Sequence, residues 1–204
     1  MIEEPSVTIP LPPGTEGVDR LRDGTPVLAR RPQASDTALI DDLVRRISEE
    51  SIERRYFSPI APESVRSELM LPYDGRDRLA LILCRQEVDR SEVVAQGEYS
   101  RDSPRSATAE VAFLVADAYQ GKGAASILLR RLARAAREQG IQRFRAIVLP
   151  ENQAMVEVFR YSGFPVVVER RDDALVVTIG IVEERRPLYE ARSDAAVAAP
   201  LPAP

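Results

Sequence analysis

The chain has 204 residues, of which 44% are hydrophobic, a size and composition that suit one well-buried domain. Its 28 basic and 32 acidic residues give a net charge of −4, and no Lys/Arg block is long enough to follow a nucleic acid backbone, so we expect no nucleic acid partner. It contains no histidine, which excludes Ser-His and Cys-His nucleophiles and histidine-ligated metal sites. We therefore expect no metal, and acid–base chemistry must fall to carboxylates, tyrosines or water.

The single cysteine and the lengths of the apolar runs indicate in which cellular compartment we expect the protein. Cys84 lies in a continuous apolar run typical of a buried strand, so we expect an unreactive core thiol and no intrachain disulfide. The longest apolar stretches are far shorter than the ~20 residues that cross a bilayer. The N-terminus lacks the basic-then-apolar order of a signal peptide. These features predict a cytoplasmic protein without a membrane partner.

Composition divides the chain into three parts. Residues 1–24 are rich in proline and glycine, and residues 185–204 end in an Ala/Pro-rich segment. Both are predicted to be poorly ordered tails. Residues 25–184 alternate between strand-like and helix-like patterns without internal repeats.

The first half of this domain is predicted as a strand, three helices and two antiparallel strands. Ser35 and Asp36 are expected to cap the first helix, and Pro62 to open the third. The predicted strands are 25–31, 78–85 and 92–100, and the second and third helices are 50–56 and 62–70.

The second half begins with a strand that alternates in polarity. Residues 108–116 place Glu110 on an otherwise apolar face with Ala112 and Leu114. The following elements are predicted as a helix at 124–138, a strand at 144–149, a helix at 152–162 and a hairpin of 164–169 with 174–183. The arginines of the first of these helices, at positions 130, 131, 134 and 137, are expected to form mostly a solvated face. Together the elements predict an α/β (α+β) fold, a mixed sheet flanked by helices.

A glycine-rich loop joins strand 108–116 to helix 124–138. Gln120 to Ala125 reads Gln-Gly-Lys-Gly-Ala-Ala, and glycines at a strand-to-helix turn expose backbone N–H groups where a helix N-terminus favours negative charge. The order of Lys122 and Gly123 does not fit a Walker loop, and the third glycine of a dinucleotide fingerprint is missing. The loop is therefore predicted to hold a phosphate of another kind of ligand.

The loop fits the pattern Gln/Arg-x-x-Gly-x-Gly/Ala and resembles motif A of the GNAT N-acetyltransferases. Asn152, followed by Gly163-Phe164, has the spacing of a second family signature, and the order of elements resembles the GNAT fold from Thr25 to Glu184. The resemblance implies a mostly antiparallel central sheet and acetyl-coenzyme A as cosubstrate. The coenzyme-binding residues that it implies are Phe113, Leu114 and Val115 by strand-like pairing with pantetheine, Gln120, Gly121, Lys122, Gly123, Ala124 and Ala125 around the pyrophosphate, and Asn152.

Three segments look like the catalytic domain of bacterial Pat-type protein lysine acetyltransferases: 21–25, 51–59 and 109–113. This likeness implies a protein lysine as acceptor, for example on acyl-coenzyme A synthetases. Two alternatives stay open: a small-molecule amine acetyltransferase and a non-catalytic coenzyme-binding module. The acceptor, the preferred acyl chain and the oligomeric state are not predicted.

Acetyl transfer to an amine requires that the ammonium first lose its proton. At pH 7 a lysine of pKa ~10.4 is neutral only about once in 2,500 molecules, so a positioned base is needed. We expect Glu110 to be this base, with burial among apolar neighbours raising its pKa; the resemblance places the Pat-type glutamate there as well. The competing interpretation is a structural salt bridge from Glu110 to an arginine, with Glu98 or a water relay as the base.

Proton donation to the leaving thiolate is less well provided for. In many GNAT enzymes a tyrosine lies seven residues after the Asn152 position, and here that residue is Phe159. Tyr161 is about 200° further around the predicted helix. We therefore expect no tyrosine acid, and water or the proton of the incoming amine takes its place. Lys122 is expected to be exposed and to add positive charge at the loop.

Overall fold

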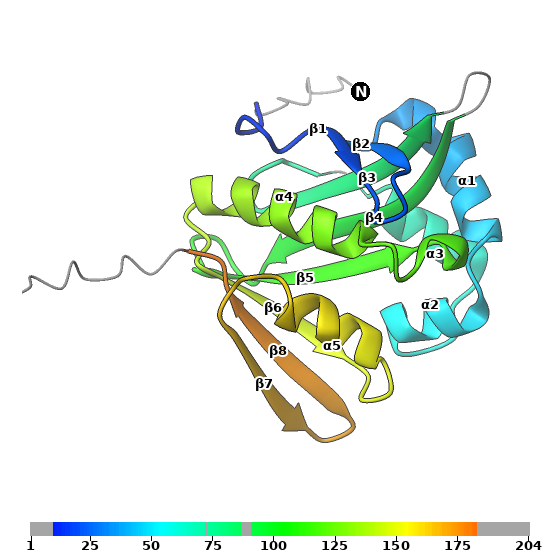
Figure 1. Ribbon diagram of the computed structural model, residues 1–204. Coiled ribbons are helices and arrows are strands. Elements are labelled where there is room, and N and C mark those ends of the chain that lie inside the picture. The colour runs from blue at the N-terminus through cyan, green and yellow to red at the C-terminus, as the bar shows by residue number, and fades with distance from the viewer. Residues whose placement is uncertain (1–9, 72, 87–90, 183–204) are drawn as a thin grey trace, which may run out of the picture.

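The computed structural model describes residues 10–71, 73–86 and 91–182, in which one eight-stranded sheet runs in the order β1-β2-β3-β4-β5-β6-β8-β7 (Figure 1). The strands are β1 (Gly17–Arg20), β2 (Pro26–Arg30), β3 (Arg78–Gln86), β4 (Ser91–Arg101), β5 (Thr108–Val115), β6 (Arg143–Val148), β7 (Val166–Arg171) and β8 (Ala174–Gly180). The helices are α1 (Thr37–Arg45), α2 (Glu49–Tyr56), α3 (Pro62–Leu69), α4 (Ala124–Glu138) and α5 (Gln153–Arg160). Among the described strands β5 and β6 form the parallel pair and the other neighbours are antiparallel. This confirms the predicted mixed, mostly antiparallel sheet flanked by helices.

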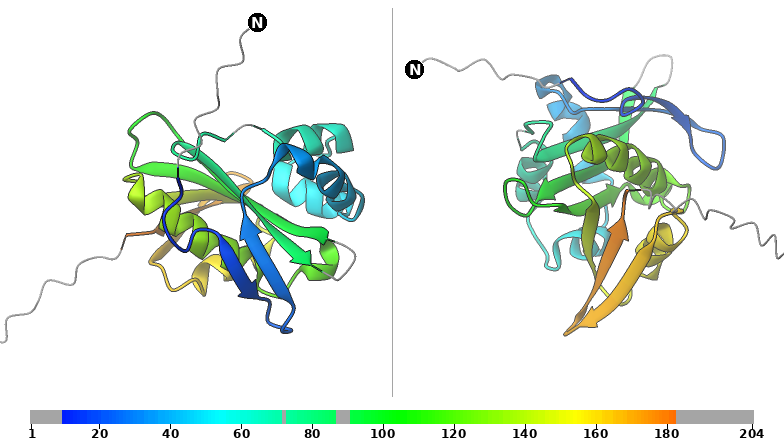
Figure 2. Two further views of the ribbon diagram at one scale, coloured as in Figure 1. Left: turned by 90° about the horizontal axis from the view of Figure 1, so that it is seen from above. Right: turned by 90° about the vertical axis from the view of Figure 1, so that its left-hand side faces the viewer.

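The helices form a layer on each face of the sheet (Figure 2). On one face, a side chain at Gly97 of β4 would meet Phe113 and Leu128, which shows how closely α4 lies over the centre of the sheet. On the other face, Glu98 contacts Arg55 of α2. Successive residues of a strand point to opposite faces, so the two helical layers pack on opposite sides of β4.

The parallel pair of β5 and β6 is short. The two strands are in register over three residue pairs, the last of which is Glu110 with Arg145. By contrast, β5 stays paired with β4 as far as Val115. Beyond Glu110 the sheet therefore splits, and β5 has a partner on one side only.

The core agrees with the pattern of apolar residues in the sequence. Tyr99 and Phe144 pack at 5.8 Å between ring centroids beneath α4, and the leucines of α4 are fully buried. Cys84 is buried in β3, and burial raises the pKa of its thiol, which disfavours the reactive thiolate. Among the described residues no helix is long and apolar enough to span a bilayer.

The N-terminal region differs from the expected tail. Residues 17–20 form β1, which pairs with β2, and Thr15 and Leu21 are buried. The cause is long-range: Arg131 of α4 binds Asp19 at 2.7 Å and the carbonyl of Gly14 at 3.0 Å. The described part of the expected tail is thus folded, while residues 1–9 and the predicted C-terminal tail at 185–204 lie outside the described residues.

The same contacts correct the expectation of a solvated arginine face on α4. Arg134 donates to the carbonyl of Pro13 at 3.1 Å, and Arg137 donates to the carbonyl of Ile181. Of the four arginines, Arg130 and Arg134 are exposed, and Arg131 and Arg137 are partly buried. Periodicity places these arginines off the apolar stripe, but it does not show that chain segments from both ends of the domain cover them.

Asp36 does not cap α1 as expected. It lies at the N-cap position, but its side chain accepts hydrogen bonds from Arg30 at 2.6 and 2.7 Å and from the backbone N–H of Gln33 at 2.7 Å. The carboxylate therefore joins β2 to the start of the helical layer.

Candidate active site

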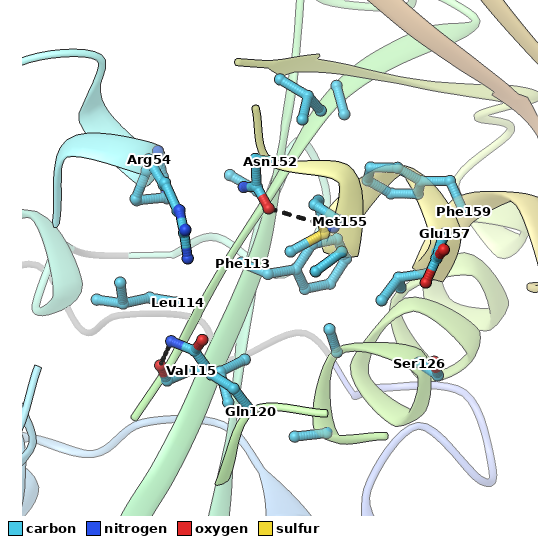
Figure 3. Close-up of a pocket in the computed structure, with 18 of the residues that line it drawn as sticks. Arg54, Phe113, Leu114, Val115, Gln120, Ser126, Asn152, Met155, Glu157 and Phe159 are labelled. Atoms are coloured by element: carbon cyan, nitrogen blue, oxygen red, sulfur yellow. Dashed lines mark hydrogen bonds between the residues drawn. The ribbon is translucent and has the colours of Figure 1, made fainter. Parts of the chain in front are cut away.

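A cavity of about 240 Å³ lies where β5 and β6 separate. Figure 3 shows its walls: Phe113, Leu114 and Val115 of β5, Gln120 of the glycine loop, and Asn152, Met155 and Phe159 of the α5 segment. The backbone of β5 on the β6 side has no strand partner there. The cavity can thus accept an extended ligand beside β5, with its far end at the loop.

The glycine loop has the conformation that its composition predicts. Gly121 and Gly123 have φ angles of 70° and 90°, in the left-handed region that favours glycine. Gly123 is the N-cap of α4 and supplies no side-chain cap, and Ile127 is the first residue whose N–H donates back to it, at 3.1 Å. The N–H groups of Ala124 and Ala125 therefore have no acceptor within the helix, and they lie at the positive end of its dipole. This end of the cavity is suited to a phosphate.

The side chain of Gln120 turns away from that anion site. Its amide nitrogen donates to Ser51 at 2.9 Å and to Asp117 at 3.2 Å. Gln120 thus anchors the loop to the start of α2, and its side-chain amide is engaged within the protein.

The side chain of Lys122 lies beside the loop but outside the cavity. It is 38% exposed, pairs with Asp23 at 3.1 Å and lies over the ring of Tyr119. Hydrogen bonds from Thr25 and then from Lys122 lower the pKa of Asp23 to about 2, so this carboxylate stays charged. Lys122 is not among the residues that line the cavity, because the ion pair holds it outside.

Arg22 lines the cavity, although the sequence did not predict a binding role for it. Its backbone N–H donates to the carbonyl of Lys122 at 2.9 Å, and its guanidinium lies 3.4 Å from the carbonyl oxygen of Gly121. Among the described residues it has no carboxylate partner. The signal was present in the segment 21–25, but only the folded chain brings that segment against the loop.

Asn152 lies at the opposite wall. It is the N-cap of α5, where its side-chain oxygen accepts from the N–H of Met155 at 3.2 Å (Figure 3). The NH₂ group of the same side chain has no partner among the described residues and can donate to a ligand carbonyl.

Phe159 occupies the position at which many GNAT enzymes have a tyrosine. Phe159 is buried and packs against Phe113 at 6.1 Å between ring centroids. Tyr161 is 82% exposed at the end of α5, on the rim of the cavity. Within the described structure neither residue provides a buried hydroxyl beside β5.

Glu110 is exposed, so the expectation that it is buried among apolar neighbours is wrong. It lies at the last register pair of β5 and β6, with Arg145, where the two strands begin to separate. It makes no ion pair with any described residue, which also removes the structural salt bridge as its role. Its carboxylate is free to take a proton from a ligand.

A second cavity of about 460 Å³ opens on the other side of Glu110. Its walls come from α2, β4, β5 and β6, and it shares Arg55, Glu110 and Ala112 with the first cavity. Glu98, the alternative base, also lines it, but its two oxygens accept from Arg55 at 2.6 Å and from the hydroxyl of Tyr73 at 2.7 Å. Both oxygens of Glu98 are thus already engaged, whereas Glu110 has no ion-pair partner among the described residues.

The profile of the Acetyltransferase (GNAT) family matches residues 46–164. The chain belongs to the GNAT acetyltransferase family. This confirms the resemblance drawn from the loop, and it makes the chain an N-acetyltransferase of a family that uses acetyl-coenzyme A.

Individual relatives agree with this assignment. The chain is 33% identical to Acetyltransferase Pat of Mycolicibacterium smegmatis over 131 residues, which are 64% of this chain and 38% of that protein. It is 31% identical to the crystal structure of the GNAT domain of S. lividans PAT, with a TM-score of 0.71 over 84% of this chain and 99% of that one. A cAMP-binding acyltransferase from Mycobacterium smegmatis is 25% identical, with a TM-score of 0.57 over 86% of this chain and 50% of that one. The chain therefore spans the length of the S. lividans domain but well under half of the curated relative.

Proposed function

We propose that this acetyltransferase transfers acetyl from acetyl-coenzyme A to the side-chain amine of protein lysines, with acyl-coenzyme A synthetases among its acceptors, in the cytoplasm. The observation that carries the proposal is the position of Glu110 at the junction of the two cavities, free of other partners. We call the cavity at the glycine loop the coenzyme cavity and the other the acceptor cavity.

The coenzyme cavity would hold the cosubstrate in an extended form. The N–H groups at the start of α4 and the guanidinium of Arg22 would bind the pyrophosphate. The unpaired backbone of Phe113 to Val115 and the amide of Asn152 would bind pantetheine, which directs the thioester toward Glu110.

The acceptor cavity would admit the amine. Glu110 takes the proton of the ammonium, and the neutral amine then attacks the thioester carbonyl. The C–N bond forms, the C–S bond breaks, and the electron pair of that bond leaves on sulfur. The second proton of the nitrogen passes to the thiolate as the amide forms, and the proton on Glu110 passes to water, which restores the carboxylate for the next cycle.

A small-molecule amine remains the competing acceptor. Glu110, which lines the acceptor cavity without an ion-pair partner among the described residues, would attract any cationic amine. The names of two relatives, Acetyltransferase Pat and the GNAT domain of PAT, favour a Pat-type acceptor. A non-catalytic coenzyme-binding role is the weakest alternative, because it gives no reason for an unpaired carboxylate between two cavities.

The test is acetyl transfer from labelled acetyl-coenzyme A. One arm offers purified acyl-coenzyme A synthetases, and the other offers polyamines, amino acids and aminoglycosides. We expect label on lysines of the synthetases and higher kcat/KM in that arm. Turnover confined to the small amines would reject the protein acceptor, and no turnover in either arm despite coenzyme binding would favour the non-catalytic role.

A further inference from the structure

Arg55 of α2 is the cation at the junction of the two cavities. It lines both of them, together with Glu110 and Ala112. Its side chain is 18% exposed, which is low for an arginine. A guanidinium at this place faces the position at which a thioester directed toward Glu110 would react.

The structure holds Arg55 firmly at this position. Its Nη2 donates to Glu98 at 2.6 Å, and Glu98 in turn accepts from Tyr73 at 2.7 Å. The guanidinium carbon lies 4.8 Å from the ring centroid of Tyr56. An arginine held by a carboxylate and an aromatic ring loses little further freedom when a ligand binds.

The register of β4 and β5 places Glu98, the partner of Arg55, near Glu110. Glu98 pairs with Ala112 across β4 and β5, and Ala112 lies two residues from Glu110 on the same face of β5. Ala112 lines both cavities. Arg55 and Glu110 thus border one opening from neighbouring positions.

The reaction needs a positive group at this opening. Negative charge develops first on the thioester oxygen and then on the departing sulfur, and Phe159 has no proton to give. A fixed cation in a partly dry site stabilises such charge without needing to reorganise. An arginine does so without losing a proton, because its guanidinium stays charged.

We propose that Arg55 is a catalytic residue whose guanidinium stabilises the oxyanion and the departing thiolate of coenzyme A. The inference rests on the proposed assignment of the two cavities. After Glu110 has taken the first proton of the ammonium, the amine forms the C–N bond. The electron pair of the C–S bond then passes to sulfur beside Arg55, and the second proton of the nitrogen passes to the thiolate. Glu98 and Tyr73 are positioning residues, since they act by holding Arg55.

Other charged groups border Arg55 or the acceptor cavity and contribute to the electrostatic potential there. Arg101 of β4 pairs with Asp77 at 2.9 Å, and Arg145 of β6 lies 3.5 Å from Asp102. The charged or titratable side chains that border Arg55 or the acceptor cavity are Tyr56, Tyr73, Glu98, Arg101, Asp102, Glu110 and Arg145. Arg22 and Arg54 line the coenzyme cavity, and Arg101 and Arg145 line the acceptor cavity. Among the described arginines Arg55 lines both, which places it at the junction where the thioester would react.

The proposal is tested on the thiol of bound coenzyme A, followed by the ultraviolet absorbance of its thiolate as pH is raised. A free thiol has a pKa near 8.5, and a neighbouring cation lowers it. We expect a lowered pKa in the wild-type complex and a return toward the free value in Arg55→Gln. With an acyl-coenzyme A synthetase as acceptor, turnover of Arg55→Gln should fall by roughly 10²–10³, the loss seen when one charge-stabilising donor is removed.

Control measurements distinguish a failure of the proposed coenzyme cavity from a failure of the proposed role of Arg55. Arg45→Gln removes an exposed arginine of α1 and should change neither the thiol pKa nor turnover. Absence of coenzyme A binding to the wild type by calorimetry would contradict the coenzyme cavity itself, and with it the proposed function. Normal binding with the same thiol pKa and turnover in Arg55→Gln would overturn the role of Arg55 alone. If Arg55→Gln does not fold, Arg55→Lys decides: it should lose about tenfold in turnover because it lacks the planar donor pair, and full wild-type turnover would overturn the proposal.

Discussion

Glu110 of β5 and Arg145 of β6 form the last pair at which these parallel strands are in register. Immediately beyond this pair the strands separate, and the coenzyme cavity occupies the gap. The carboxylate thus lies at the point where the sheet splits, within reach of both cavities. The position of the proposed base and the shape of the cleft therefore have one common cause.

The first prediction concerns the glycine loop. Gly123→Val should raise the Kd for acetyl-coenzyme A by more than about tenfold, because valine is strained at a φ of 90° and its side chain would meet Arg22 at 3.4 Å. Calorimetry measures the change. Gly140→Val is the matched control, since Gly140 has a φ of 76° at the far end of α4 with open space around it. It should reduce stability and leave the Kd unchanged; near-normal affinity in a folded Gly123→Val protein would contradict the loop as the anion site.

The second prediction compares two cations beside that loop. Lys122→Ala should change the Kd for acetyl-coenzyme A by less than about threefold, because its charge is already paired with Asp23 outside the cavity. Arg22→Gln should raise the Kd by about tenfold, because its guanidinium borders the anion site without a carboxylate partner. Both are measured by calorimetry at one ionic strength, and the reverse order of effects would show that Lys122 swings into the cavity on binding.

The third prediction tests the base. Glu110→Gln should keep coenzyme binding and lower kcat by roughly 10²–10⁴. Raising the pH should partly restore activity, because a larger fraction of the acceptor amine is then neutral. A pH–rate profile of both proteins gives the answer, with Glu169→Gln on the exposed β7 as control. Wild-type turnover of Glu110→Gln at pH 7 would place the base elsewhere.

The fourth prediction concerns the folded N-terminal segment. Arg131→Ala should lower the free energy of unfolding by about 2–3 kcal/mol, because the side chain is 13% exposed and its loss leaves Asp19 and backbone carbonyls without a donor. Arg130→Ala changes the neighbouring exposed arginine, which has no partner among the described residues, and should be nearly neutral. Urea denaturation compares the two, and equal stabilities would mean that β1 does not depend on α4.

The fifth prediction is a pH dependence. Burial raises the pKa of Asp36, but hydrogen bonds from Arg30 and Gln33 outweigh it and leave this pKa below its usual value. A lowered pKa in the folded state contributes stability above the unfolded pKa of ~3.9, and that contribution is lost as pH falls through the folded pKa. The difference in unfolding free energy between wild type and Asp36→Asn should therefore be constant near neutral pH and shrink below about pH 4. Asp172→Asn, at the exposed hairpin turn, should show no such trend.

The sequence by itself determined the features that depend on local rules. Gly121 and Gly123 have the positive φ angles that a strand-to-helix phosphate turn requires, and α4 begins and ends at the predicted residues. Alternation along β5 placed Glu110 on the face opposite Phe113, as the structure has it. Periodicity and turn chemistry act over a few residues, so they can be read without knowledge of the fold.

The tertiary structure decided what depends on distant partners. Strand β1 is held by Arg131, which is more than a hundred residues away, and Arg22 meets the glycine loop across a similar distance in the chain. Glu110 lies where β5 and β6 separate, and no local pattern in either strand indicates that separation. Arg55 lies at the junction of the two cavities because Glu98, on another strand, holds it there. Spacing along a chain does not specify which of many arginines meets which carboxylate; packing of the sheet between its helical layers does.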